Sequence, residues 1–557
     1  MDFLQIVVVL AIAVILAVPL AKYLTSVYSL EITKQDRIFG SMERYIYKLS
    51  GIKTHDMTWQ QYAKALLLSN LVMFFISYMI LRFQGELPGN PSDVDGMEPL
   101  LAFNTAASFL TNTNLQHYSG ESGLSYLSQM AVIIFLMFTT PATGLSMCMA
   151  FFRGLTGQRN LGNFYVDLIR TITRVLLPLS ILIGLILVSQ GVPQTFSPTA
   201  IATTLEGATQ NIARGPVAAL ESIKHIGTNG GGFFGVNSAH PFENPNGFTN
   251  VLEIISMFLI PAALPLTFGY MARNKKQGWI LFSAMGLMLV LFLGMTYFNE
   301  KNGNPSLEQI GLSQENGSME GKEVRLGVAQ SALFTSITTA ATTGSVNNMH
   351  DTLTPLGSIA PLAMMMVNCV FGGEGVGTIN ILMYSIMAVF LAGLMVGRTP
   401  EFLGKKIEGQ EMKLIAIAIL LHPLIILVPS AIALATQMGS AAISNPGFHG
   451  ISQVVYEFTS SAANNGSGFE GLGDNTPFWN ISTGLVMLFG RYFSMFAMIA
   501  VAGSLLVKKR VPETMGTFKT DNGTFLVILL ATVLIIGALT FFPIMALGPI
   551  AEWLTIR

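Results

Sequence analysis

Ten apolar stretches, each long enough to cross a lipid bilayer, constrain this 557-residue chain more than any other feature. A helix needs about 20 predominantly apolar residues to span the hydrocarbon core. Only 11% of the residues are charged, well below the roughly 25% typical of soluble domains. The expected spans lie near residues 3–28, 60–83, 125–152, 168–191, 248–272, 277–297, 357–396 (interrupted), 412–437, 479–507 and 522–547. The sequence therefore predicts an all-α polytopic membrane protein.

The first apolar stretch is expected to stay in the protein as a membrane helix. It has no basic segment ahead of it, and Asp2 is acidic. It is also longer than the apolar core of a signal peptide, which is about 7–15 residues.

Composition and motifs argue against several other classes of protein. A net charge of −1 gives no reason to expect nucleic acid as a partner. The two cysteines, Cys148 and Cys369, each lie in an apolar run, which argues against a disulfide framework or a cysteine metal site. There is no GxxxxGK[ST] phosphate loop, and FKTDNGT (518–524) is interpreted as a polar turn. We expect no catalytic site, no organic cofactor and no bound ATP in this chain.

Basic residues indicate the orientation of the spans. Most of the 30 Lys and Arg residues fall in alternate connections, at 29–58, 153–174, 273–276, 398–413 and 508–519. Cytoplasmic loops carry an excess of Lys and Arg. With ten spans, this pattern places both termini outside.

The outer connections share a second pattern. Each contains a mildly apolar stretch too short to span, followed by a cluster of Gly, Asn, Thr and Ser: residues 98–116, 215–234, 329–347 and 451–470. Each copy lies between one spanning helix and the next, which indicates an internal fourfold repeat of helix, re-entrant helix, loop and helix. The predicted segments are an N-terminal helix (1–30), repeats at 59–153, 165–272, 276–397 and 411–508, and a C-terminal helix (520–550).

Four re-entrant loops imply a central pore that conducts a cation. Non-helical backbone is tolerated at membrane depth only where it is buried in protein or lines a water-filled path. The C-terminus of each short helix is the negative end of its dipole and favours a cation. Backbone carbonyls in the loop that follows can replace the hydration shell of K⁺. A single such loop is more often an ordinary polar turn, and it is the fourfold repetition that favours a filter.

The candidate filter residues act mostly through their backbone carbonyls. They are Thr111, Asn112, Thr113, Asn114 and Gln116 in the first loop, Thr228, Asn229, Gly230, Gly231 and Gly232 in the second, Thr342, Thr343, Gly344 and Ser345 in the third, and Asn464, Asn465, Gly466, Ser467 and Gly468 in the fourth. The first loop lacks glycine, so the filter is expected to be asymmetric, with Gln116 near its mouth.

At these loops the sequence resembles the superfamily of K⁺ transporters that includes the Trk, Ktr and HKT proteins. The strings IGTNGGGFFGVNSAHPFENP (226–245) and TSSAANNGSGFEGL (459–472), together with the extra first and last spans, are more similar to the KdpA family. These are the potassium-binding subunits of bacterial Kdp P-type ATPases, and the resemblance covers essentially the whole chain. It implies K⁺ as substrate and a lateral tunnel for K⁺ to a P-type ATPase catalytic subunit. It also implies a single-span accessory subunit and often a small membrane peptide subunit.

The seventh span is broken by FGGEGVGT (371–378), because three glycines and a glutamate do not continue a stable helix in lipid. The relatives place a gating loop here, so the gating candidates are Gly373, Glu374, Gly375 and Arg491, with Glu374 and Arg491 as a potential pair. The alternative is a static buried ion pair or an arginine that reaches the membrane surface.

Other polar residues near the loops are expected to be structural. Lys224 is expected to point away from the pore and to pair with an acidic group such as Glu221. Glu457 and Glu470 flank the fourth loop and are expected to accept backbone hydrogen bonds. Without metal-ligand spacing, His117, His240, His350 and His449 are interpreted as solvated loop residues.

Three functions remain open on the sequence alone. The first is a K⁺-translocating subunit of an ATP-driven pump. The second is a stand-alone K⁺ channel or an ion-coupled K⁺ transporter of the Trk/Ktr type. The third, a membrane-embedded enzyme, is disfavoured because the spans hold only isolated charges.

Overall fold

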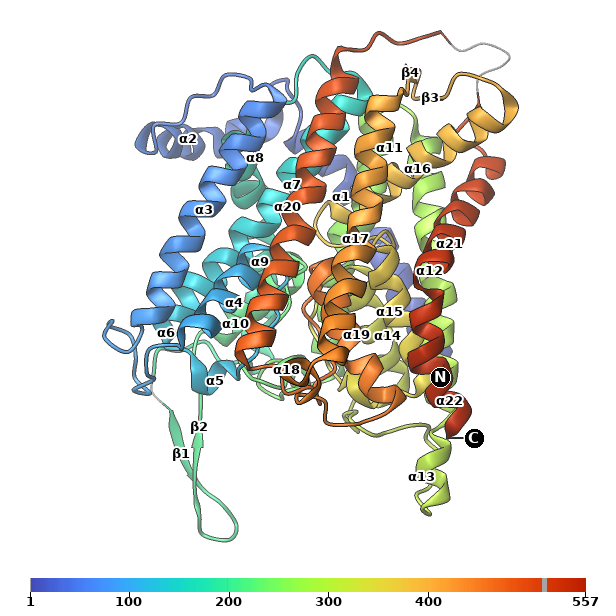
Figure 1. The fold of residues 1–557 in the computed structure, drawn as a ribbon. Coiled ribbons are helices and arrows are strands. Elements are labelled where there is room, and N and C mark those ends of the chain that lie inside the picture. The colour runs from blue at the N-terminus through green and yellow to red at the C-terminus, as the bar shows by residue number, and fades with distance from the viewer. Residues whose placement is uncertain (1, 198, 513–517, 557) are drawn as a thin grey trace.

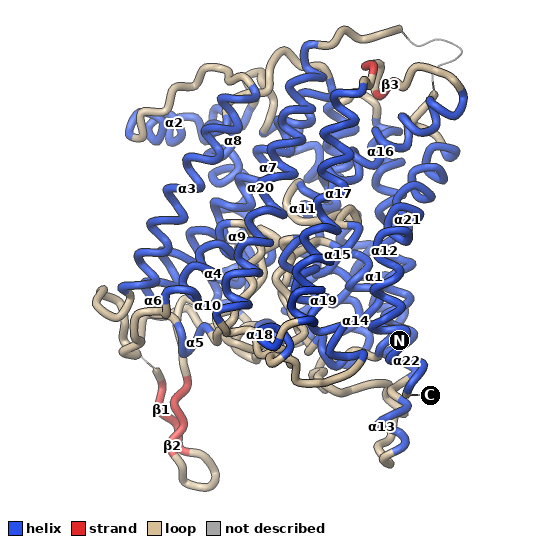
Figure 2. The backbone as a smooth tube through the Cα atoms, in the orientation of Figure 1, coloured by secondary structure: helices blue, strands red, loops and turns tan. Residues whose placement is uncertain are grey.

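The computed structural model of the protein describes residues 2–197, 199–512 and 518–556, and most of these are helical (Figure 1). The helices are α1 (Asp2–Val27), α2 (Lys34–Leu49), α3 (Trp59–Phe83), α4 (Pro99–Leu110), α5 (Gly120–Gly123), α6 (Tyr126–Ser128), α7 (Phe135–Thr156), α8 (Phe164–Arg170), α9 (Leu177–Ser189), α10 (Val217–Ile226), α11 (Gly247–Met271), α12 (Lys275–Asn302), α13 (Pro305–Gln309), α14 (Gly327–Ala340), α15 (Pro355–Val367), α16 (Val376–Val396), α17 (Gly409–Ala435), α18 (Gln437–Ser440), α19 (Phe448–Ala463), α20 (Pro477–Val507), α21 (Gly523–Met545) and α22 (Ala551–Thr555). Two small antiparallel hairpins lie at opposite ends of the bundle (Figure 2): β1 (Ala200–Thr203) with β2 (Thr209–Ile212), and β3 (Glu401–Phe402) with β4 (Lys405–Lys406).

The ten expected membrane spans are confirmed. Within the described residues, 10 helical segments are long and apolar enough to cross a membrane, and each overlaps one of the expected stretches. Three of them contain a π-helical turn, at Gln129–Ile134, Thr171–Leu176 or Ala546–Ile550, which joins shorter helices end to end. The prediction of an all-α polytopic fold is therefore correct.

The four expected short helices are also present, as α4, α10, α14 and α19, with 12, 10, 14 and 16 residues. At 1.5 Å per residue none of them is long enough to cross the hydrocarbon core. The start of α4 is fixed by its sequence: Pro99 occupies the first turn, and the Glu98 carboxylate accepts hydrogen bonds from the amides of Leu100 and Leu101. Because an anion is favoured at the positive N-terminal end of the helix dipole, this cap also stabilises the helix electrostatically.

The interrupted span divides into α15 and α16. The break covers residues 368–375 rather than the expected 371–378. Asn368, with a φ of 45°, ends α15 in the left-handed region, and Gly375, with a φ of 86°, begins α16. The last three residues of the expected break therefore belong to the helix. The sequence located the glycines but missed the asparagine, which also adopts the left-handed conformation readily.

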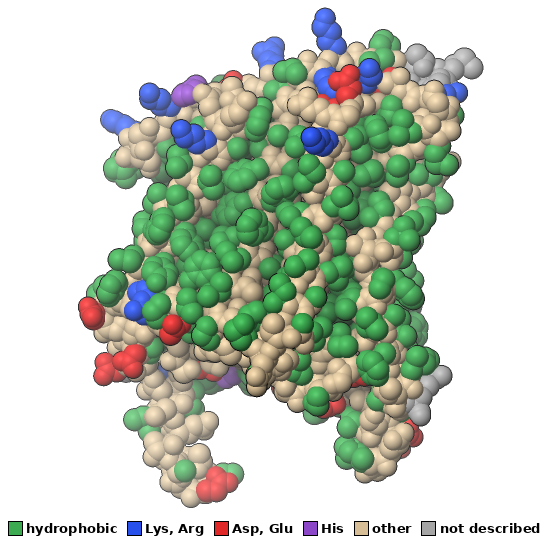
Figure 3. All heavy atoms as spheres, viewed as in Figure 1, with side chains coloured by type: hydrophobic (Ala, Val, Ile, Leu, Met, Phe, Trp, Pro, Cys, Tyr) green, Lys and Arg blue, Asp and Glu red, His purple; other side chains and the backbone are tan. Residues whose placement is uncertain are grey.

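The surface divides into an apolar belt and two polar ends. Figure 3 shows apolar side chains over the middle of the visible face, mostly Lys and Arg at the end that carries α2 and β3, and Asp and Glu at the other end. Both termini lie toward the acidic end (Figure 1). This arrangement is what an even number of spans requires.

One ion-paired histidine connects the short C-terminal helix α22 to the rest of the bundle. His449, in the first turn of α19, contacts Asp351 Oδ1 through Nε2 at 3.0 Å and Glu552 Oε1 of α22 through Nδ1 at 2.9 Å. Burial alone would lower the pKa of this imidazole, but the hydrogen bonds to the two carboxylates outweigh that effect and raise the pKa to about 9. The expectation of a solvated His449 is therefore wrong.

The raised pKa predicts a stability that falls as pH rises. The folded protein holds the His449 proton more tightly than the unfolded chain, where the histidine pKa is about 6.5. The stabilisation is thus complete below pH 6.5 and is lost as pH rises toward 9, with a slope of at most about 1.4 kcal/mol per pH unit. In thermal melts of the purified protein, we expect His449→Gln to lower the melting temperature at pH 6.5 and to approach the wild type at pH 9.5. Parallel pH dependences in the two proteins would exclude this link.

Candidate functional site

The four loops that follow the short helices meet and brace one another. Asn112 of the first loop donates a hydrogen bond to the carbonyl of Thr228 in the second, at 2.9 Å. Asn464 of the fourth loop donates to Thr113 Oγ1 of the first, also at 2.9 Å. Two further contacts complete the ring: His225 of α10 lies 3.0 Å from Ser345 Oγ of the third loop, and Asn465 donates to the Thr338 carbonyl of α14 at 2.9 Å. Segments separated by more than 300 residues thus form one closed assembly.

Each of these loops contains two residues with positive φ. In three loops the two are separated by one residue: Asn112 and Asn114, Thr342 and Gly344, and Asn464 and Gly466. In the second loop they are Thr228 and Gly231. The four loops are unequal, as the glycine-free first loop predicts.

Backbone carbonyls of different loops converge around the glycines. A methyl group added to Gly230 would lie 2.9 Å from the Thr343 carbonyl oxygen and 3.0 Å from that of Thr113. One at Gly344 would overlap the carbonyl of Asn465, and one at Gly466 that of Thr113. Carbonyl oxygens of three loops therefore lie against glycines of neighbouring loops, and the absence of side chains at these glycines permits this close approach.

Amide side chains in the loops are used as braces. Asn229 donates to the carbonyls of Met137 and Ile223 at 3.0 and 3.2 Å. Gln116 accepts from the Gly232 amide at 2.8 Å and donates to the Gly232 carbonyl at 3.2 Å, which ties the first loop to the second. Because most of the loop amides are engaged in this way, the backbone carbonyls are the main candidate ion ligands, although Asn114 Oδ1 has no hydrogen-bond partner among the described residues. The site therefore suits a desolvated monovalent cation.

Two strained threonines connect the filter to the broken span. Thr228 and Thr342 have φ values of 45° and 44°, which are unusual for β-branched residues. Their hydroxyls accept hydrogen bonds from the backbone of the break: Thr342 from Gly373 N at 2.5 Å, and Thr228 from Glu374 N at 3.0 Å. Residues 368–375 thus lie directly against the inner end of the second and third loops.

Glu374 and Arg491 lie near each other without forming the expected ion pair. Within the described part of the chain, no salt bridge shorter than 4.0 Å joins Glu374 to Arg491. Arg491 instead donates a hydrogen bond to the Thr140 carbonyl of α7 at 3.3 Å. The Glu374 carboxylate is fully buried and has no hydrogen-bond partner among the described residues. A methyl group at Gly144 would lie 2.5 Å from the Glu374 carbonyl oxygen and 2.8 Å from Arg491 Nη2. The Glu374 backbone and the Arg491 guanidinium therefore pack against α7 at this glycine.

Lys224 belongs to a buried charge cluster behind the second loop, as expected. Its ammonium contacts Glu221 Oε2 at 2.7 Å and Glu243 Oε2 at 2.8 Å, and it donates to Asn237 Oδ1 at 2.9 Å. Glu243 in turn accepts from the Phe234 amide at 2.8 Å, just after the filter glycines. The Lys224 ammonium therefore stabilises the second loop through Glu243.

The contacts of the other outer-loop histidines were not predicted from the sequence. His117 and His350 are buried and His240 stacks on Phe234 at 3.8 Å, so the expectation of solvated loops is wrong for them too. His117 Nε2 lies 3.4 Å from Glu457 Oε1 and 3.7 Å from Asp474 Oδ2. Burial would lower its pKa, but the charge of Asp474 and the hydrogen bond to Glu457 raise it to about 9.

The two glutamates that flank the fourth loop have different contacts. Glu470 Oε2 accepts a hydrogen bond from the Asp351 amide at 3.1 Å, which agrees with the expected structural role. Glu457 contacts a histidine side chain instead of the expected backbone amides. The partners of Glu457 and Glu470 lie more than 100 residues away in the chain. No local sequence pattern therefore predicts these contacts.

The Lys224 cluster predicts a strong effect of charge removal. Taking one partner out of a buried ion pair costs about 3–5 kcal/mol, because the remaining charge has no compensation. We expect Lys224→Met to lower the melting temperature markedly, whereas Glu221→Gln, which leaves the Lys224–Glu243 contact intact, has a smaller effect. Thermal melts in detergent measure both. Equal losses in the two variants would contradict the assigned role of Lys224.

Comparisons with known proteins identify the family and the fold of this chain. The model of the potassium-transporting ATPase A subunit family, KdpA, matches residues 7–554. A potassium-transporting ATPase potassium-binding subunit from Geobacillus kaustophilus (strain HTA426) is 62% identical over 557 residues, covering 100% of this chain and 99% of the relative. The crystal structure of the potassium transporter TrkH from Vibrio parahaemolyticus shares the fold, with a TM-score of 0.52 and 17% identity over 79% of this chain and 84% of that one. The chain belongs to the KdpA family of potassium-transporting ATPase A subunits.

Proposed function

We propose that this chain binds K⁺ with high affinity and translocates it across the bacterial inner membrane, as the channel-like subunit of an ATP-driven potassium pump. The observation that carries the proposal is the convergence of the Thr113, Thr343 and Asn465 carbonyls from three braced loops. Such oxygens replace the hydration shell of K⁺ without a charged ligand. Each loop also follows the negative end of a short helix, which adds favourable potential for a cation.

The proposed filter consists of the backbone of residues 111–114, 228–232, 342–345 and 464–468, with Gln116 as a brace at its outer mouth. The four segments 59–153, 165–272, 276–397 and 411–508 act as membrane–pore–membrane repeats around it. The basic end of the bundle faces the cytoplasm, and both termini face the periplasm, in keeping with the positive-inside rule.

Residues 368–375 form the proposed gate below the filter. Gly373 and Glu374 hold the strained Thr342 and Thr228, and strain of this kind is typical of sites that switch. A narrow cavity of about 50 Å³ lies beside the break and is lined by Asn368, Asn464 and Arg491 among others. This cavity is the candidate start of a lateral path for K⁺, with the Arg491 charge opposing premature passage.

The proposed partners follow from family membership. They are a P-type ATPase catalytic subunit, which binds and hydrolyses ATP, a single-span accessory subunit and a small membrane peptide subunit. The alternative, a stand-alone channel or an ion-coupled transporter, requires none of them. Affinity purification of the tagged chain from native membranes separates the two: recovery of a P-type ATPase with K⁺-stimulated ATP hydrolysis supports the pump, and recovery of the chain alone overturns it.

Two glycines of the fourth loop provide a matched test of the filter. Gly466 has a φ of 104°, and a methyl group there would overlap the Thr113 carbonyl; at Gly468 it would meet only Glu457 Oε2, at 3.3 Å. Backbone strain of about 1–3 kcal/mol corresponds to about a fivefold to 150-fold change in affinity. We therefore expect Gly466→Ala to raise the half-saturating K⁺ concentration of the ATPase at least about fivefold, and Gly468→Ala to change it little.

The measurement is K⁺-stimulated ATP hydrolysis by the purified complex over a range of K⁺ concentrations, with each variant checked for intact assembly. If the two alanine variants respond to K⁺ alike, the fourth loop does not bind the ion as proposed.

A further inference from the structure

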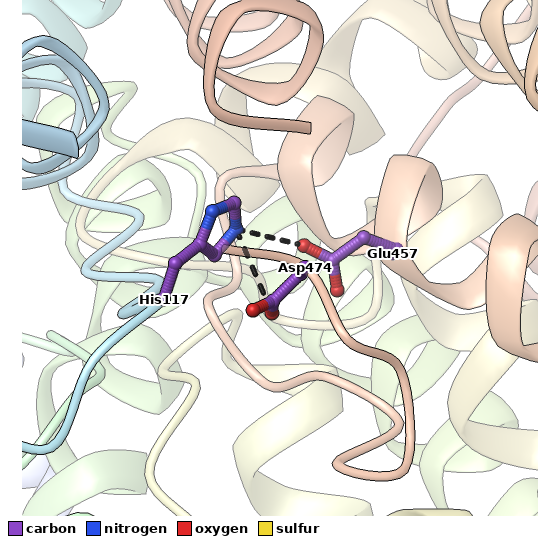
Figure 4. Close-up of side chains that lie close together, drawn as sticks. All are labelled: His117, Glu457 and Asp474. Atoms are coloured by element: carbon purple, nitrogen blue, oxygen red, sulfur yellow. Dashed lines mark hydrogen bonds and ion pairs between the residues drawn. The ribbon is translucent and has the colours of Figure 1, made fainter. Parts of the chain in front are cut away.

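Three potential metal ligands from distant parts of the chain converge at the outer mouth of the proposed filter. His117 follows the first loop, Glu457 lies on α19, and Asp474 follows the fourth loop (Figure 4). One atom from each residue, His117 Nε2 and a carboxylate oxygen of each acid, lies within 4.8 Å of the other two. Nitrogen and oxygen ligands bind Zn²⁺ at about 2.0–2.2 Å, so two ligand atoms of a tetrahedral site are about 3.4 Å apart. The observed distances from Nε2, 3.4 and 3.7 Å, fit that geometry.

The imidazole is oriented by a hydrogen-bonded support. Its Nδ1 lies 2.7 Å from Asn480 Oδ1. The Asn480 amide nitrogen donates to Asn475 Oδ1 at 3.1 Å, so Oδ1 is the acceptor and Nδ1 carries a proton. Nε2 is thereby directed at the two carboxylates. Metal-binding histidines are characteristically fixed through their second ring nitrogen in this manner.

The two carboxylates differ in their exposure to solvent. Glu457 is almost fully buried, and its second oxygen, Oε2, has no hydrogen-bond partner among the described residues. The Asp474 side chain is 24% exposed, which opens the cluster to the outer solution. A buried carboxylate oxygen without a partner is costly, and a dication bound by the Glu457 carboxylate would offset part of that cost.

Two other acid–histidine groups lack these features. In the buried group of Glu221, His225 and Glu253, the Lys224 ammonium lies 2.7 Å from Glu221 and excludes a second cation. His449 contacts Asp351 and Glu552 through opposite ring nitrogens. Its two carboxylates therefore do not share one ion with the ring.

We propose that His117, Glu457 and Asp474 form a binding site for a transition-metal dication, with Zn²⁺ as the best match to one imidazole and two carboxylates. On binding, the proton on Nε2 leaves to solvent and an Nε2–Zn bond replaces the N–H bond, while water completes the coordination. The ion links the first loop to α19 and to the segment after the fourth loop. It therefore acts at the mouth of the filter rather than within it.

The test is isothermal titration calorimetry of the purified complex with Zn²⁺, without ATP. We expect one saturable site per chain, with affinity reduced at least about tenfold, or 1.4 kcal/mol, in both His117→Gln and Asp474→Asn. The matched control is His449→Gln, a histidine with two acidic partners, which should bind Zn²⁺ like the wild type.

Two outcomes would overturn the proposal: no saturable binding to the wild type, or binding that neither His117→Gln nor Asp474→Asn weakens. Asp474 is partly exposed and tolerates replacement by the isosteric asparagine. The titration of Asp474→Asn therefore remains informative if the His117→Gln complex does not assemble. Because the titration involves no pumping, a negative result here leaves the proposed K⁺ function untouched, and the reverse also holds.

Discussion

The rest of this structure depends on the hydrogen bonds that the four loops make with one another. Backbone that leaves the helical conformation at membrane depth loses its own partners and finds no water in lipid. Here the replacements come from side chains of neighbouring loops, such as Asn112 with Thr228 and Asn464 with Thr113. No single loop is stable in this conformation without the others. This explains why filter segments hundreds of residues apart are rich in Asn and Thr as well as in Gly.

The same requirement connects the filter to the broken span. Thr228 and Thr342 adopt strained conformations that a β-branched residue avoids. The amides of Glu374 and Gly373 stabilise that conformation because they donate hydrogen bonds to the threonine hydroxyls. Any movement of residues 368–375 removes those bonds and therefore changes the stability of two filter loops at once. The gate proposed at this position would act on ion binding through the backbone, and it would not require a Glu374–Arg491 pair.

Much of the fold was predictable because its signals are local. Span length, the four short apolar stretches and the glycine-rich break each depend on fewer than 40 consecutive residues, and the structure contains all of them. The Lys224–Glu221 pair was predictable for the same reason, as an i,i+3 contact on one helix. The partners of His117 were not, because Glu457 and Asp474 lie about 350 residues further along the chain. Polar residues of the outer loops therefore appeared solvated when the fold buries them.

Lys224 illustrates how a cation is tolerated beside a proposed cation pore. A lone ammonium there would repel K⁺, and burying it would cost several kcal/mol. Two acidic side chains within 2.8 Å of its nitrogen balance its charge, and a third, Glu253, lies in the same buried group. The cluster as a whole therefore does not present a positive charge to the second loop. The lysine contributes rigidity through Glu243 and Phe234, so the filter retains both its shape and its attraction for cations.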